Sequence, residues 1–105
     1  MCLNKKYRDK LALEQELITI RNDAFCSYTL DRAKRRLKRI KKHLTDEQYT
    51  KIWACIQNLD INNPDTYVPE WARQNPDYKR HMLYLRTELA DYIEAIIDEK
   101  KAGDK

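Results

Sequence analysis

The sequence contains a single glycine, Gly103, two residues from its end. This scarcity excludes the glycine-rich loops that hold phosphates in P-loop and dinucleotide-binding proteins, because those loops need several glycines close together. Long apolar runs are absent as well. Runs such as Ala95-Ile96-Ile97 fall far short of the roughly 18 residues that a membrane-spanning helix requires. We therefore expect no such nucleotide site and no contact with a membrane.

Cysteine is scarce and irregularly placed, at Cys2, Cys26 and Cys55. A small secreted domain normally carries an even and denser set of cysteines, and a signal peptide would need an apolar run near the start. This pattern favours reduced thiols in a cytoplasmic protein. His43 and His81 have no second metal ligand at the usual spacing, so we expect no metal ion and no cofactor.

Helical periodicity runs through most of the 105 residues, 42% of which are hydrophobic. Apolar residues recur at steps of three and four, whereas alternation typical of strands does not persist. The fold class expected is therefore all-α, a compact bundle of four main helices with a short extra helical turn between the third and fourth. We expect one domain over residues 1–105, frayed at 1–3 and 101–105, with main helices near 4–23, 29–43, 45–59 and 76–100 and the extra turn near 69–73.

Local signals mark several helix ends. Thr45 and Gln48 form a capping-box pattern, in which each side chain bonds the other residue's backbone amide. Two Asn-Pro-Asp tripeptides, beginning at Asn63 and Asn75, are typical of helix starts. Trp71 is expected to pack the connection onto the bundle. The last helix is longer than the second and third, so part of it should remain uncovered and offer a contact for a homodimer.

The expected core follows one apolar stripe on each helix. Leu83 belongs to a second stripe that flanks the main one on the last helix, together with Ala90 and Ile97. The main stripes consist of Leu13, Leu17, Ile20 and Ala24; Leu30, Ala33, Leu37, Ile40 and Leu44; Tyr49, Ile52, Trp53, Ile56 and Leu59; and Met82, Leu85, Leu89, Tyr92 or Ile93, and Ile96.

Positive charge is concentrated in the second helix. Residues 27–44 hold eight basic residues against one acidic residue, in a chain whose net charge is +4. A row of cations on a rigid helix can follow a DNA or RNA phosphate backbone, and arginine binds phosphate with two parallel hydrogen bonds. We expect a non-enzymatic nucleic-acid-binding regulator whose phosphate-binding residues are Arg32, Lys34, Arg35, Arg36, Lys38, Arg39, Lys41 and Lys42.

Two other interpretations of this helix remain open. The same cations suit an acidic protein surface, as in a modulator or inhibitor of the kind that phages and mobile elements encode, docking on a nucleic-acid-processing complex. The last interpretation is a solvated face that acidic residues of helices three and four neutralise, within the chain or across a dimer. Surface ion pairs contribute only about 0–1 kcal/mol each, so stability alone is a weak reason to gather eight cations.

Three tyrosines fall outside the apolar stripes, at Tyr28, Tyr67 and Tyr84. An aromatic ring on the surface can stack on a nucleic-acid base or fill a pocket on a partner protein. We expect these three to lie at an interface.

Arg36 is followed after six residues by His43. This spacing resembles the Arg-x(4–6)-His pattern of HEPN-type ribonucleases, which are also small helical bundles. The resemblance covers eight residues, and Leu37 stands where the family commonly has a polar residue. It implies RNA cleavage that is lost on His43→Ala, and it is the third hypothesis behind the two non-enzymatic ones.

Overall fold

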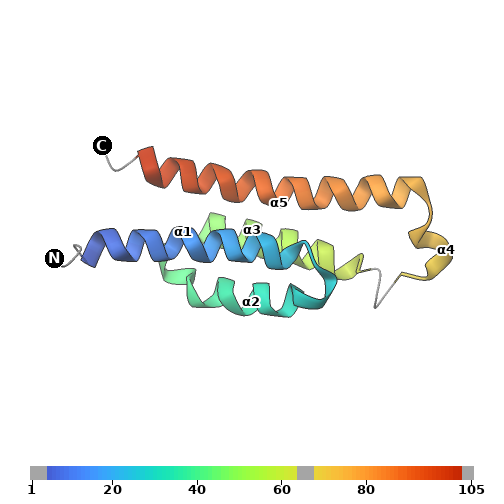
Figure 1. Ribbon diagram of the computed structural model, residues 1–105, viewed down its shortest axis with the longest axis horizontal. Helices are drawn as coiled ribbons and strands as arrows, with labels where there is room; N and C mark the ends of the chain where they lie inside the picture. Colours follow the sequence, from blue (N-terminus) through green and yellow to red (C-terminus); the bar gives the residue numbers. More distant parts are fainter. Residues whose placement is uncertain (1–4, 64–67, 103–105) are drawn as a thin grey trace.

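The structure is a computed structural model that describes residues 5–63 and 68–102. Its helices confirm the expected all-α bundle of four main helices with a short helical turn in the last connection (Figure 1). A 3-10 turn, η1, precedes α2, and a second one, η2, follows it. The elements are α1 (Lys5–Ala24), η1 (Ser27–Thr29), α2 (Leu30–Arg39), η2 (Lys41–His43), α3 (Asp46–Ile61), α4 (Glu70–Arg73) and α5 (Pro76–Ala102).

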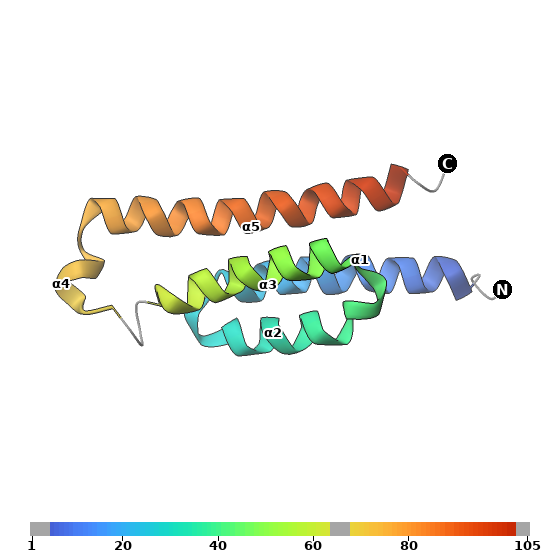
Figure 2. The ribbon, with the colours of Figure 1, turned by 180° about the vertical axis from the view of Figure 1, so that it is seen from behind.

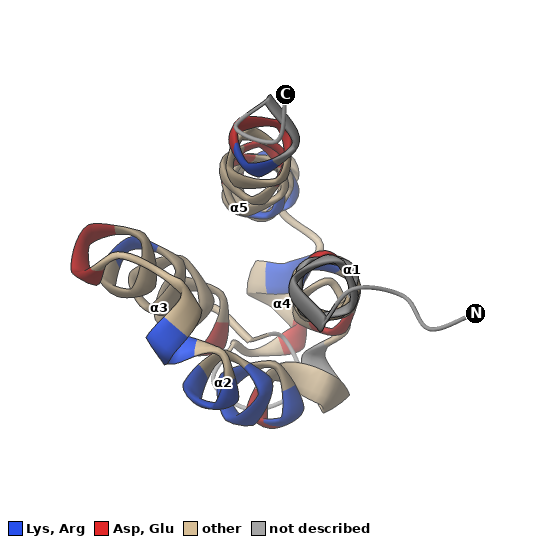
Figure 3. Ribbon diagram, turned by 90° about the vertical axis from the view of Figure 1, so that its left-hand side faces the viewer, with Lys and Arg blue, Asp and Glu red and all other residues tan. Residues whose placement is uncertain are grey.

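The four main helices alternate in direction along an elongated bundle. Figures 1 and 2 show α1 and α3 running one way and α2 and α5 running the other. Each helix contacts two neighbours: α1 packs on α2 and α5, and α3 packs on the same two helices. Viewed along its length, the bundle places α2 and α5 at opposite corners (Figure 3). The basic helix is therefore exposed along the side that faces away from α5.

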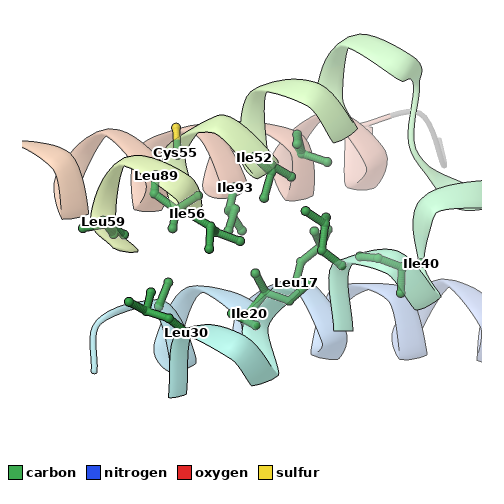
Figure 4. Close-up of a cluster of buried hydrophobic side chains, with 14 of the residues drawn as sticks. Leu17, Ile20, Leu30, Ile40, Ile52, Cys55, Ile56, Leu59, Leu89 and Ile93 are labelled. Carbon is green, nitrogen blue, oxygen red and sulfur yellow. The ribbon is translucent and has the colours of Figure 1, made fainter. Parts of the chain in front are cut away.

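One hydrophobic core joins the four helices. Its fully buried side chains come from every main helix, and Figure 4 shows many of them converging between the helices. The predicted stripes are confirmed at most positions, while Tyr49, Trp53, Leu44 and Tyr92 are half-buried at its edge. The largest fully buried residues are Leu17, Ile20, Leu37, Ile52, Ile56, Leu59, Leu89 and Ile93.

The predicted caps explain where α3 and α5 begin. The backbone amide of Gln48 donates to Thr45 Oγ1 at 3.0 Å, and the amide of Thr45 donates to Gln48 Oε1 at 2.9 Å. Before α5, the Asn75 side chain accepts a hydrogen bond from the amide of Asp77 at 2.8 Å. The tripeptide that begins at Asn63 continues into residues 64–67, which lie outside the described residues.

Three expectations about the helices need correction. Trp71 in α4 is 79% exposed, so it does not pack the connection onto the bundle. Leu83, near the start of α5, is 64% exposed, whereas Ala90 and Ile97 of the same stripe are half-buried and buried. The last helix, α5, also continues to Ala102, past the point at which fraying was expected to begin. Residues 1–3 and 103–105 lie outside the described part.

The structure offers no segment suited to crossing a lipid bilayer: among the described residues, no helix is both long and apolar enough.

Candidate phosphate-binding surface

The α2 segment and the turn after it divide into four rows of residues. Leu30, Ala33, Leu37 and Ile40 are buried and form the apolar seam that was predicted. The eight cations fall into three further rows, because residues three and four apart share one face of a helix. One row faces α1, one faces α3, and one lies between them on the solvent side. We call the first two the α1 flank and the α3 flank, and the third the crest.

The α1 flank consists of Arg32 and Arg36, which both contact Asp23. Asp23 is only 8% exposed although its side chain is a carboxylate. Arg32 donates to both of its oxygens, from Nη2 to Oδ1 at 3.1 Å and from Nε to Oδ2 at 3.2 Å. Arg36 Nε lies 3.3 Å from Oδ2 of Asp23, and Arg36 Nη1 lies 3.4 Å from Glu16 Oε1. Two guanidinium groups of α2 thus hold two carboxylates of α1.

The α3 flank consists of Lys34, Lys38 and Lys41. Lys34 Nζ donates to Asp60 Oδ2 at 3.0 Å. The ammonium groups of Lys34 and Lys38 also lie 5.7 and 5.5 Å from the centre of the Trp53 ring. Lys41 Nζ lies 4.9 Å from the centre of the Tyr49 ring, which stacks on Trp53 with the centroids 6.3 Å apart. Cation–π attraction of this kind is strongest over tryptophan, so these lysines hold α2 against α3.

The crest consists of Arg35, Arg39 and Lys42, and all three side chains are exposed. None of them makes an ion pair, side-chain hydrogen bond or ring contact with another described residue. At 1.5 Å per residue, Arg35 and Arg39 are roughly 6 Å apart along the axis of α2, and Lys42 follows in η2. The crest is therefore a row of positive charge whose counterions come from outside the described fold.

The acidic residues of α5 do not neutralise the basic helix. The carboxylates that pair with α2 cations are Glu16, Asp23 and Asp60, which belong to α1 and α3. On α5, Glu94 pairs with Arg21 of α1, and the helix itself lies at the opposite corner of the bundle (Figure 3). Described carboxylates thus pair with three flank cations, Arg32, Lys34 and Arg36, and with none of the crest.

A shallow pocket opens beside the C-terminal end of α2. It has a volume of about 330 Å³ and lies between α1 and the turn η2. Arg39 and Lys42 of the crest line it, together with Ala12, Leu13, Glu16, Ile40 and His43. The crest and the pocket therefore form one continuous surface.

The three candidate tyrosines do not converge on this surface. Tyr28 lies in η1, directly before α2, and is 82% exposed. Tyr84 is also exposed but belongs to α5, where it lines a second pocket with Lys51, Glu88 and Asp91. Tyr67 lies outside the described residues. Of the three, only Tyr28 is placed next to the basic helix.

Arg36 and His43, which carry the resemblance to HEPN-type ribonucleases, have different surroundings. Arg36 is held by Glu16 and Asp23, as described above. His43 is exposed and lines the pocket with Arg39 and Lys42, whereas Arg36 is not part of that lining.

Within the described ranges the structure also holds two free cysteines, Cys26 and Cys55. Cys26 is exposed after α1, whereas Cys55 is buried in α3. Burial, and next the nearby carboxylate of Glu88, raise the pKa of the Cys55 thiol above its ordinary value of 9.0, so Cys55 has little thiolate character at neutral pH. A search of the described residues finds no group of three or more His, Cys, Asp or Glu side chains arranged to hold a metal ion.

No family model, curated protein or solved structure matches this chain.

Proposed function

We propose that this protein is a small cytoplasmic nucleic-acid-binding regulator that holds phosphate groups on the crest of α2 and acts by occupancy, without catalysing a reaction. The observation that carries the proposal is that Arg35, Arg39 and Lys42 are exposed and make no ion pair in the described part of the chain. Like charges three and four residues apart weaken a helix. An anionic ligand removes that repulsion and releases the ligand's own counterions.

The proposed mode of binding relies on the backbone of the nucleic acid. The exposed positions of α2 carry only Asp31, Arg32, Arg35, Lys38 and Arg39. Asn, Gln, Ser and Thr, which read base edges or donate to them in many DNA-binding helices, are missing from α2. Phosphate contacts position a protein without selecting a sequence, so we expect weak dependence of affinity on base sequence.

The experiment measures binding to labelled duplex DNA, single-stranded DNA and RNA over a range of salt concentrations. The crest variant carries Arg35→Gln, Arg39→Gln and Lys42→Gln. Its matched control carries Lys51→Gln, Lys79→Gln and Arg80→Gln, which remove the same charge from exposed positions outside α2.

We expect the crest variant to lose at least about tenfold in affinity at 100 mM salt. The slope of log affinity against log salt on duplex should fall by about 2 to 3, because each lost phosphate contact removes about 0.9. The control should change affinity by less than about threefold, since it leaves the contact surface intact. Absence of binding at low salt, or an equal loss in both variants, would refute the proposal.

A second candidate is a modulator that docks on a partner protein, such as a nucleic-acid-processing complex. It is favoured by large apolar side chains exposed where α1 and α3 end and α4 and α5 begin, at one end of the bundle (Figure 1). These side chains are Phe25, Tyr28, Ile61, Trp71, Leu83 and Tyr84. Monomeric proteins seldom gather exposed apolar residues without an interaction to serve.

Affinity capture in high salt separates this second candidate from the first. The protein is compared with a Trp71→Ser, Tyr84→Ser variant and with the crest variant, after nuclease treatment of the lysate. A docking modulator retains its partner in the crest variant and loses it in the Trp71→Ser, Tyr84→Ser variant. Loss of the partner only in the crest variant would refute docking through the exposed apolar side chains at this end of the bundle.

A further inference from the structure

The pocket beside the crest combines two kinds of surface. Its apolar part consists of Ala12, Leu13 and Ile40, and its cationic part consists of Arg39 and Lys42. Leu13 and Ile40 are core residues, nearly buried, so they are fixed in place by the packing of α1 on α2. The pocket therefore has an apolar floor fixed by the core, next to two exposed cations.

A nucleotide has two parts that match these two kinds of surface. Its base offers a flat face that binds apolar surfaces, and its phosphate is an anion that binds arginine and lysine. A duplex offers the pocket only its phosphates, because a paired base reaches such a site only after it leaves the stack. A pocket of about 330 Å³ also falls in the lower part of the usual size range for sites that take small organic groups.

The acidic residue in the pocket does not oppose an anion there. Both carboxylate oxygens of Glu16 lie near Arg36 Nη1, at 3.4 and 3.5 Å. The Arg36 guanidinium therefore balances the charge of Glu16 within the α1 flank. The two crest cations keep their positive charge available for a ligand.

We infer that the pocket takes one unpaired nucleotide, with the base on Leu13 and Ile40 and a neighbouring phosphate on Arg39 and Lys42. The preferred ligand is then a single-stranded nucleic acid. This inference rests on the proposed function, because it uses two of the three crest cations. It adds a contact to the base, which the crest alone does not make.

The experiment compares a base-bearing single strand with an abasic strand of equal length, which has the same phosphates and no bases. It uses both a DNA and an RNA version of the base-bearing strand. The variant is Ala12→Leu, which adds three carbons to an exposed position in the pocket lining. The matched control is Ala54→Leu, the same change at an exposed position of α3. Helicity is checked by circular dichroism for both.

The protein should bind at least one base-bearing strand about tenfold more tightly than the abasic strand, which corresponds to about 1.4 kcal/mol of binding free energy. Ala12→Leu should bring this ratio close to one, and Ala54→Leu should leave it unchanged. A ratio near one in the unmodified protein, or a ratio that survives Ala12→Leu, would overturn the inference. If crest-dependent binding to the abasic strand persisted in either case, the proposed function would stand without the pocket. If no strand bound, both would fail.

Discussion

The flanks and the crest of α2 contain the same residue types but have different surroundings. The five flank cations lie against carboxylates or aromatic rings of α1 and α3. The three crest cations lie in solvent, although they belong to the same segment, α2 and η2, and alternate with the flank residues along the sequence. Charge density on a helix therefore does not by itself measure the surface available to a ligand.

The flank cations and the crest cations are therefore expected to have different roles. Flank cations replace the solvation of their partners and fix the position of α2 between α1 and α3. Crest cations add repulsion to the folded state and remain open to an anion. If the flank cations hold the fold and the crest cations bind the ligand, substitutions in the flanks should alter stability and substitutions in the crest should alter binding.

The largest effect on stability is expected for Asp23→Ala. Asp23 is buried and is shared by Arg32 and Arg36, so its loss leaves Arg32 without its carboxylate and Arg36 with Glu16 alone. Removing one member of a buried ion pair costs 3–5 kcal/mol, and these arginines are partly exposed, so we expect about 2–3 kcal/mol of unfolding free energy to be lost. Urea denaturation followed by circular dichroism measures it.

Asp91→Ala is the control for this change, because Asp91 is an exposed carboxylate in the middle of α5. Its effect should stay within about 0.5 kcal/mol. Equal losses for Asp23→Ala and Asp91→Ala would show that the α1 flank does not hold α2 in place.

A smaller loss is expected for Trp53→Leu, which keeps an apolar side chain but removes the ring beneath Lys34 and Lys38. At a partly exposed site, two cation–π contacts and one stacking contact with Tyr49 contribute about 0.5 kcal/mol each, or about 1.5 kcal/mol of unfolding free energy in all. A double-mutant cycle isolates the contact: Lys38→Gln should cost about 0.5 kcal/mol with Trp53 present, and nothing with Leu at that position. An unchanged cost in both backgrounds would mean that the ring does not bind Lys38.

Much of the fold was predictable because its signals are local. The apolar stripes fix which face of each helix is buried, and the Thr45–Gln48 capping box fixes where α3 begins. Trp71 and Leu83 were predicted wrongly for a shared reason. Both lie where the bundle ends or where a helix has no neighbour, and periodicity does not reveal which apolar face has a partner.

The candidate surface was predictable in its location but not in its division into rows. The sequence shows eight cations, whereas the partners that occupy five of them lie on other helices, α1 and α3. One signal was present: Glu16 and Asp23 are seven residues apart, and Arg32 and Arg36 are four apart. Each pair therefore shares a helix face, as in the charged positions that border the seam of a coiled coil. The sequence holds no such signal for the pocket, because the pocket depends on how α1 packs beside η2 in the folded chain.

The smallest expected effect is on the stability of the crest variant itself. It tests directly whether the crest cations lack partners in the fold. Arg35 and Arg39 are four residues apart and Arg39 and Lys42 three apart, with no described counterion. Repulsion of this kind costs about 0.2–0.5 kcal/mol per pair. Replacing the three crest cations by glutamine should therefore raise the unfolding free energy by a few tenths of a kcal/mol in low salt, as measured by urea denaturation.

The gain should disappear in high salt, because at 1 M the screening length falls to about 3 Å. Loss of stability on neutralising the crest would mean that these cations have partners in the fold, and the distinction between flank and crest would fail. Higher stability together with weaker nucleic-acid binding is the combination that only an unpaired crest explains, because the same three charges that weaken the free protein would be the ones that hold its ligand.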